Sequence, residues 1–145
     1  MVKVLVKRLN SKVKLPEYKT SGSSGMDLMA SIDSPIKIAP NTLELIPTGL
    51  SIAIPDDLEI QIRPRSGLAA KNNISVLNTP GTIDSDYRGE IKIILFNHGN
   101  SEFIINNKDR VAQMILTPVA KIRFEETDNL PDTVRGEGGF GSTGK

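Results

Sequence analysis

There is no cysteine among the 145 residues, so neither a disulfide framework nor a thiolate metal site can form. The single histidine, His98, excludes a metal site built from several histidines. No stretch approaches the ~18 apolar residues of a membrane-spanning helix, so we expect no membrane partner. The first ten residues, MVKVLVKRLN, carry charges every few positions, so we expect no signal peptide and a cytoplasmic protein.

Aromatic residues make up only 4% of the chain, so the core has to be built from isoleucine, leucine and valine. An aliphatic core of this kind often gains stability by association, which weakly favours an oligomer. The net charge of +1 gives no global field that would attract nucleic acid or an acidic membrane. No basic stripe with interleaved aromatics is present, so a nucleic-acid binder is the least favoured class.

Apolar residues recur mostly with a period of two. The segment 58–63, LEIQIR, alternates strictly, with its aliphatic residues on one face and its polar residues on the other. Proline, glycine and asparagine separate many such short segments, which favours an all-β sandwich or barrel. The expected strands cover 2–9, 35–40, 43–46, 50–54, 58–63, 90–97, 103–105, 111–120 and 121–124.

One segment breaks the strand pattern. Residues 66–72, SGLAAKN, contain good helix formers and predict one short helix, with Ser66 as its candidate N-cap. We assign residues 1–130 to a single β domain. Residues 131–145 form its glycine-rich tail, which we expect to be flexible unless something holds it. Its last seven residues, GFGSTGK, match the spacing of a phosphate-binding loop, but such a loop needs a helix after its lysine, so we expect the match to be coincidental.

Asp27 and the pair Arg65 and Ser66 are candidate functional positions in the first half of the chain, and each also has an ordinary structural interpretation. Asp27 follows a glycine and precedes apolar residues, which is typical of a turn aspartate at the start of a strand. Arg65 and Ser66 stand where the short helix begins, and an arginine fork beside a hydroxyl suits a phosphate group. A capped helix with an arginine facing solvent explains the same two residues equally well.

The segment 78–92, NTPGTIDSDYRGEIK, places turn formers between two apolar runs and predicts a β-hairpin. Asp84 and Asp86 lie two residues apart and share a face if the backbone is extended, with Tyr87 beside them. A solvated hairpin tip has the same composition. Because an apolar strand leads into Asp84, we expect its carboxylate to be half buried, which requires a reason.

Polar residues also interrupt the segment 110–116, RVAQMIL, where Arg110 and Gln113 fit an ordinary half-exposed strand. The tail contains Arg135 ahead of its glycines and Phe140 as its only aromatic residue. An apolar ring in such a tail usually docks onto a ligand or a partner. His98 is expected to be a solvated turn residue.

Taken in order, the segments GMDLMA, PRSGLAA, GTIDSDYRGEIK, RVAQMI and RGEGGFGSTG resemble the five motifs of the trimeric deoxyuridine triphosphatase (dUTPase) family. The resemblance runs from about residue 25 to 144. The one departure noted is Ser24, where the family often has alanine. The resemblance implies a jelly-roll β-barrel in a homotrimer with active sites between subunits. It further implies hydrolysis of dUTP to dUMP and pyrophosphate with Mg²⁺, which keeps uracil out of DNA and supplies dUMP for thymidylate synthesis.

The resemblance also implies a role for each matching residue. Asp84 would be the base that activates water for attack on the α-phosphorus, Tyr87 would pack on the deoxyribose, and Asp27 would contact magnesium through water. Phe140 would stack on uracil as the tail closes over the site. Uracil would be read by Asn78 and by main-chain groups around Thr82, Ile83 and Lys92. The remaining substrate contacts implied are Arg65, Ser66, Gly67, Gln113, Arg135, Gly141, Ser142 and Thr143.

Two alternatives stand beside this prediction. A dCTP deaminase shares the fold in outline, but the run IDSDYRG argues against it. A non-catalytic nucleotide-binding module could use the same trimer. The presence of Asp84, Arg65, Ser66 and Phe140 together argues against that module.

Overall fold

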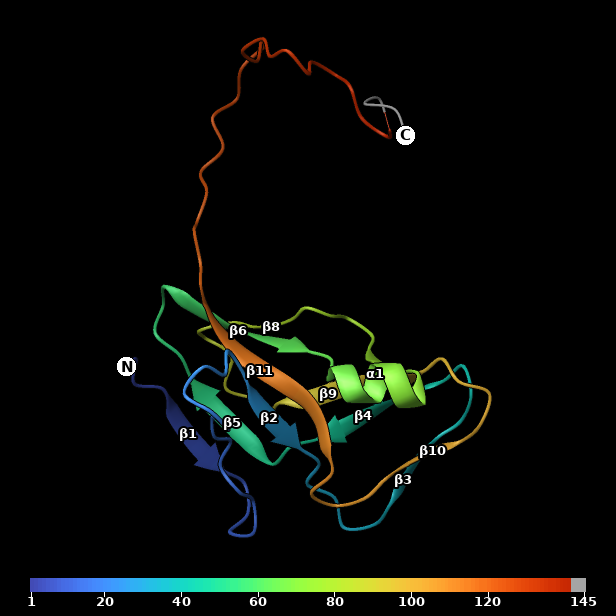
Figure 1. Cartoon of the computed structure of the whole chain (residues 1–145). Helices are drawn as coiled ribbons and strands as arrows, with labels where there is room; N and C mark the ends of the chain where they lie inside the picture. Colours follow the sequence, from blue (N-terminus) through green and yellow to red (C-terminus); the bar gives the residue numbers. More distant parts are fainter. Residues whose placement is uncertain (142–145) are drawn as a thin grey trace.

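The structure is a computed structural model that describes residues 1–141, and it contains eleven strands and one short helix in that range (Figure 1). Every strand pairing is antiparallel. The largest sheet has the order β2 (Met26–Met29), β11 (Arg110–Pro118), β6 (Leu58–Arg63), β8 (Gly81–Ile83). A second sheet has the order β4 (Leu43–Pro47), β9 (Lys92–Asn97), β7 (Ile74–Val76). Two strand pairs complete the fold, β1 (Leu5–Arg8) with β5 (Leu50–Ala53) and β10 (Phe103–Ile105) with β3 (Ile36–Ile38).

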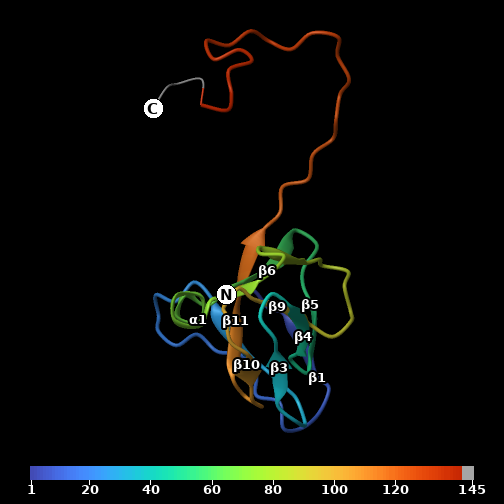
Figure 2. The same cartoon turned by 90° about the vertical axis from the view of Figure 1, so that its right-hand side faces the viewer.

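The sheets pack face to face around an aliphatic core. Figure 2 places β11 and helix α1 (Ser66–Asn72) toward one side of the domain and β1, β4 and β5 toward the other. Isoleucine makes up ten of the nineteen buried hydrophobic residues, and no aromatic residue is among them in the described part of the chain. The expected all-β fold with an aliphatic core is therefore confirmed.

Most predicted elements appear close to their predicted bounds. Strands β6 and β10 and helix α1 match them residue for residue. Ser66 is not the N-cap, because Arg65 occupies that position with an extended backbone (φ −90°, ψ 127°) and no side-chain capping bond. Residues 121–124 form no strand, since the last backbone bond to the domain is donated by the Val119 N–H to the Asp57 carbonyl and no neighbouring strand lies beyond it.

The segment 78–92 is not a hairpin, contrary to the sequence prediction. Strand β8 pairs with β6, whereas β9 pairs with β4 and β7 in the other sheet. The loop between β8 and β9 therefore crosses from one sheet to the other. Strand β9 has β4 on one side and β7 on the other, so both of its edges are already paired and β8 has no edge of β9 to join.

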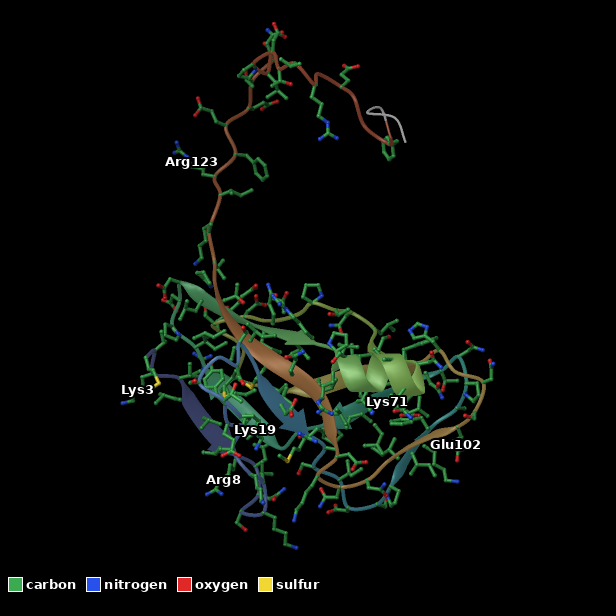
Figure 3. All side chains as sticks on the ribbon, viewed as in Figure 1. Lys3, Arg8, Lys19, Lys71, Glu102 and Arg123 are labelled. Carbon is green, nitrogen blue, oxygen red and sulfur yellow. The ribbon has the colours of Figure 1, made fainter. Side chains whose placement is uncertain are left out.

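The chain after β11 extends away from the domain (Figure 1). Arg123 and the other side chains of this segment stand clear of the strands (Figure 3). Within residues 1–141, the hydrogen bonds of residues 120–141 join members of this segment only. The same range contains no helix long and apolar enough to cross a membrane.

Candidate active site

A cavity of about 370 Å³ lies where β8 ends and β9 begins. Five residues proposed from the sequence line it, namely Thr82, Ile83, Asp84, Tyr87 and Lys92. Leu45 and Glu90 also line it and were missed. Glu90 lies inside the segment 78–92 that the sequence singled out, so this segment was the available signal for it. Leu45 reaches the cavity only through the pairing of β4 with β9, which places it opposite Ile94.

The loop that borders this cavity is closed by its own hydrogen bonds. The Tyr87 N–H donates to the Asp84 carbonyl at 3.2 Å, and the Tyr87 hydroxyl donates to the Glu90 carbonyl at 2.9 Å. Arg88 donates to the carbonyls of Ser85 (2.6 Å) and Tyr87 (2.9 Å). The backbone of the loop thereby fixes how far the Tyr87 ring stands from Asp84.

Asp84 is exposed in the single chain, although its sequence context predicted a half-buried carboxylate. The apolar run before it ends at Ile83, and the loop carries Asp84 out of the sheet. Within residues 1–141 its carboxylate makes no hydrogen bond or ion pair. The oxygens of Asp84 are therefore available to a water molecule or a ligand in the cavity.

Asn78 lies just before β8 and is exposed, outside the residues that line the cavity. Its amide nitrogen would be 3.1 Å from a Cβ atom placed on Gly81. Glycine at position 81 therefore leaves the space that this amide occupies.

A second cluster joins β2, β11 and the start of α1 around the carboxylate of Asp27. Arg65 Nε donates to Asp27 Oδ1 at 2.9 Å, and an Arg110 guanidinium nitrogen donates to Oδ2 at 3.3 Å. The Asp27 side chain is only 18% exposed. Asp27 lies inside β2 opposite Gln113 rather than in a turn, so the turn interpretation is wrong.

Gln113 holds the segment before the helix in place, since its Nε2 donates to the Pro64 carbonyl at 2.9 Å. A Cβ atom on Gly25 would lie 3.0 Å from Gln113 Oε1, so glycine lets this side chain lie flat against β2. Ser66 and Gly67, the first residues of α1, are exposed beside Arg65. The predicted phosphate-binding residues of the domain are thus neighbours.

The two groups lie at opposite ends of β6. Strands β8 and β6 are antiparallel, and Ile83 pairs with Ile60, so Asp84 lies near the start of β6. Arg65 lies two residues beyond the last residue of β6. At ~3.3 Å per residue, the five steps from Leu58 to Arg63 place the two ends about 17 Å apart along the strand. One chain therefore does not bring Asp84 and Arg65 to a common point.

The tail residues proposed from the sequence lie away from both groups. Arg135 Nε donates to the Gly138 carbonyl at 2.7 Å, and the Phe140 side chain is fully exposed. Gly141 has a φ of +90°, a conformation that glycine adopts readily. Ser142 and Thr143 fall outside the described residues.

The outer face of the second sheet is apolar. Leu43 and Leu45 on β4 stand opposite Phe96 and Ile94 on β9, and Leu77 follows β7 beside them. Leu43, Leu45 and Leu77 are each more than 40% exposed. This outer apolar face adjoins the cavity through Leu45, which belongs to both.

The described residues contain no group of three or more acidic, histidine or cysteine side chains that could enclose a metal ion. Mg²⁺ commonly keeps several waters and takes substrate phosphates as ligands, so it does not need such a group. Each Asp27 oxygen bonds one arginine and retains acceptor capacity for a water. The Asp27 carboxylate therefore suits a Mg²⁺ ion that is held mainly by the phosphates of a bound substrate.

A family model described as dUTPase matches residues 11–144. A deoxyuridine 5'-triphosphate nucleotidohydrolase of Rickettsia massiliae is 54% identical over 99% of this chain and 98% of its own length. The enzyme of the same name from Maricaulis maris is 55% identical over 90% of this chain and 87% of its own.

Solved structures resemble the fold. A mutant dUTPase of Staphylococcus bacteriophage 80alpha with dUpNHpp has a TM-score of 0.89, with 20% identity and full coverage of both chains. A mutant dUTPase from phage phi11 of S. aureus, described with a structural Mg(II) ion, has a TM-score of 0.81 at 18% identity, covering 90% of this chain and all of its own. At these identities the likeness concerns the fold alone, and it agrees with the predicted jelly roll.

Proposed function

We infer the function of this chain from one premise, which is that it belongs to the dUTPase family, as the family model and the 54% identical relatives show. It is an enzyme that hydrolyses dUTP. We propose that the products are dUMP and pyrophosphate, so that the reaction removes a source of uracil in DNA and supplies dUMP for thymidylate synthesis. The observation that carries the proposed mechanism is the cavity lined by Asp84, Tyr87 and the edge of β8.

Uracil enters this cavity against main-chain groups. Strand β8 pairs only with β6 among the described strands, so its other edge presents free N–H and C=O groups near Thr82 and Ile83. Uracil and cytosine differ in where they donate and accept hydrogen bonds, and a backbone edge distinguishes these patterns. Cytosine would leave buried groups unpaired, which disfavours it strongly. Asn78 and the main chain of Lys92 complete the recognition of the base.

Asp84 acts as the general base in this proposal. Its carboxylate has no partner within residues 1–141, so it can accept a proton from water. The water attacks the α-phosphorus, and the bond to the oxygen that bridges the α- and β-phosphorus breaks, with pyrophosphate leaving. The Tyr87 ring packs on the sugar and leaves no room for a 2′-hydroxyl. A base in this role contributes about 10²–10⁴ in rate.

The triphosphate binds at Arg65, Ser66, Gly67 and Gln113. The nucleotide carries about four negative charges, whereas the whole chain has a net charge of only +1. Positive groups must therefore be concentrated at the site, where they stabilise charge in a preorganised environment. Arg65, held by Asp27, supplies one of them in the domain, and Arg135 supplies another from the tail.

We propose that Mg²⁺ binds with the substrate, held by its phosphates and by water, with Asp27 contacting one of these waters. When bound, the ion neutralises charge on the phosphates and orients them for attack. Asp27 serves the site in a second way, because it fixes the direction of the Arg65 guanidinium.

The active enzyme is proposed to be a homotrimer. Two observations support this assembly: Asp84 and Arg65 lie at opposite ends of β6, and the outer apolar face is exposed beside the cavity. A neighbouring copy would cover this face and bring its own Arg65 cluster to Asp84. The tail, residues 131–145, would reach a site formed by other copies and close over it, with Phe140 on uracil, Arg135 on the phosphates, and Gly141, Ser142 and Thr143 beside them.

The purified protein tests this proposal with a panel of nucleotides and a magnesium titration. With dUTP and Mg²⁺ we expect equal amounts of dUMP and pyrophosphate, loss of turnover with a chelator, and recovery when Mg²⁺ is returned. Absence of pyrophosphate at every Mg²⁺ concentration would refute the proposal. Release of ammonia from dCTP would identify a deaminase instead.

A further inference from the structure

Beyond the residues assigned so far, Glu90 connects the loop that carries Tyr87 to the body of the domain. Its carbonyl accepts the Tyr87 hydroxyl at 2.9 Å, and its Oε1 accepts the Gly49 N–H at 2.9 Å. Its other carboxylate oxygen lies 3.9 Å from Lys92 Nζ. The Glu90 side chain is 22% exposed and borders the cavity.

The Gly49 end of this connection is fixed by packing. Gly49 is buried in the turn between β4 and β5 with a φ of +68°. A Cβ atom there would lie 2.5 Å from Val13 Cγ2, so the turn has no room to shift toward this neighbour. Glu90 therefore accepts its bond from a rigid part of the domain.

The Tyr87 end has little freedom of its own. A Cβ atom on Gly89 would lie 2.3 Å from the Tyr87 hydroxyl oxygen, so the ring lies directly over the glycine backbone. The remaining side-chain bonds of the loop, from Arg88 to Ser85 and Tyr87, stay within the loop. Among the described residues, the Tyr87 hydroxyl bonds to Glu90, and the side chain of Glu90 in turn contacts Gly49.

We propose that Glu90 is a positioning residue that sets the place of the Tyr87 ring and thereby the discrimination between deoxyribonucleotides and ribonucleotides. The inference rests on the proposed function, in which the ring excludes a 2′-hydroxyl. A ring excludes one oxygen atom only if its distance from the sugar is fixed. The peptide that accepts the Tyr87 hydroxyl is held twice: its Ile91 N–H donates to the Leu50 carbonyl at 2.8 Å, and the Glu90 carboxylate accepts the Gly49 N–H at 2.9 Å. The Glu90 side chain is the second of these two attachments, and it is the one that sets the residue on the side of the cavity.

The test compares kcat/KM for dUTP with that for UTP in Glu90→Ala and Glu90→Gln. Alanine removes the acceptor of the Gly49 N–H, and the loss of one such hydrogen bond corresponds to about a tenfold change. We expect the ratio of the two kcat/KM values to fall about tenfold in Glu90→Ala. Glutamine keeps a side-chain oxygen at the same place, so Glu90→Gln should stay within about twofold of the wild type.

Tyr87→Phe tests the same connection from its other end, since it keeps the ring and the Glu90–Gly49 bond. We expect a similar fall in the ratio, and the double variant with Glu90→Ala should fall little further, because both changes break one connection. Glu44→Ala is the matched control, as Glu44 is an exposed glutamate on neighbouring β4 without a hydrogen bond or ion pair in the described part of the chain.

The outcomes separate this inference from the proposed function. If the wild type does not hydrolyse dUTP, the proposed function fails and this inference fails with it. If the wild type is active but Glu90→Ala or Tyr87→Phe keeps the wild-type ratio, only the inference is overturned. Equal losses toward dUTP and UTP, together with a lower Tm, would show a merely structural role and would also overturn it.

Discussion

At the scale of single residues, we expect turnover to depend most on Asp84. Its carboxylate is free among the described residues and borders the same cavity as Tyr87. In Asp84→Ala we expect kcat to fall by about 10²–10⁴, because the change removes the proposed base. Nucleotide binding should persist, because the groups proposed to bind the uracil and the phosphates remain. Pyrophosphate release and calorimetric binding of a non-hydrolysable dUTP analogue measure the two quantities.

Asp86→Ala serves as the control for this prediction. Asp86 is an exposed aspartate two positions away in the same loop, and it does not line the cavity. Its replacement should leave kcat close to that of the wild type. The assignment of the base would be wrong if Asp86→Ala lost turnover and Asp84→Ala kept it.

Side-chain chemistry was easier to predict than side-chain environment. The sequence identified Asp84, Tyr87, Arg65 and Gln113 as candidates, but it placed Asp84 in a half-buried position and Asp27 in a turn. Burial depends on what crosses over a residue in space, and the loop after Ile83 leaves the sheet. The partnership of Asp27 with Arg110 spans 83 residues and is invisible to local patterns.

At the scale of elements, Asp27 ties β2 to β11 and to the start of α1. In Asp27→Asn the amide would leave two guanidinium groups close together without a counterion, so Arg65 should lose its fixed direction. We expect kcat/KM for dUTP to fall about tenfold or more and the free energy of unfolding to fall by about 1–3 kcal/mol. Steady-state kinetics and urea denaturation measure these effects.

An exposed ion pair elsewhere provides the comparison. Glu102, labelled at the edge of the domain in Figure 3, lies 3.1 Å from Lys37 Nζ, and its side chain is 44% exposed. Glu102→Gln should change the free energy of unfolding by less than about 0.5 kcal/mol, as exposed pairs usually do. Equal effects of the two changes would contradict a special role for Asp27.

Strands could be predicted from the sequence better than their partners. The strict alternation of 58–63 gives β6 its bounds and its buried face, because Ile60 and Ile62 point into the core. The same reasoning predicted that β8 and β9 form a hairpin, which is wrong. A short turn-rich loop can connect two strands of one sheet or cross between two sheets, and the sequence pattern does not distinguish these cases. Residues 121–124 alternate like a strand, but a strand requires a neighbour, and the part of the chain that the structure describes offers none there.

At the scale of the whole molecule, large apolar side chains are exposed both on the domain and on the segment after β11. The outer apolar face is exposed, and the segment after β11 presents Ile122, Phe124 and Phe140, each at least 75% exposed. Large exposed apolar surfaces mark sites of association. We expect a solution mass three times that of one chain, measured by light scattering.

Removal of residues 135–145 tests the tail as a lid. Within the described part of the chain no hydrogen bond joins the deleted residues to the domain, so the proposed trimer should fold with an unchanged Tm. Turnover should nearly vanish, because the deletion removes Arg135 and Phe140 together. Full turnover after this deletion would refute the lid.

The central claim is that water activated by Asp84 attacks the α-phosphorus of dUTP, and hydrolysis in ¹⁸O-labelled water tests it most directly. Attack at the α-phosphorus leaves the new oxygen on dUMP, whereas attack at the β-phosphorus leaves it on pyrophosphate. Mass spectrometry of both products should find one ¹⁸O atom in dUMP and none in pyrophosphate. Label in pyrophosphate, or no hydrolysis at all, would contradict the claim.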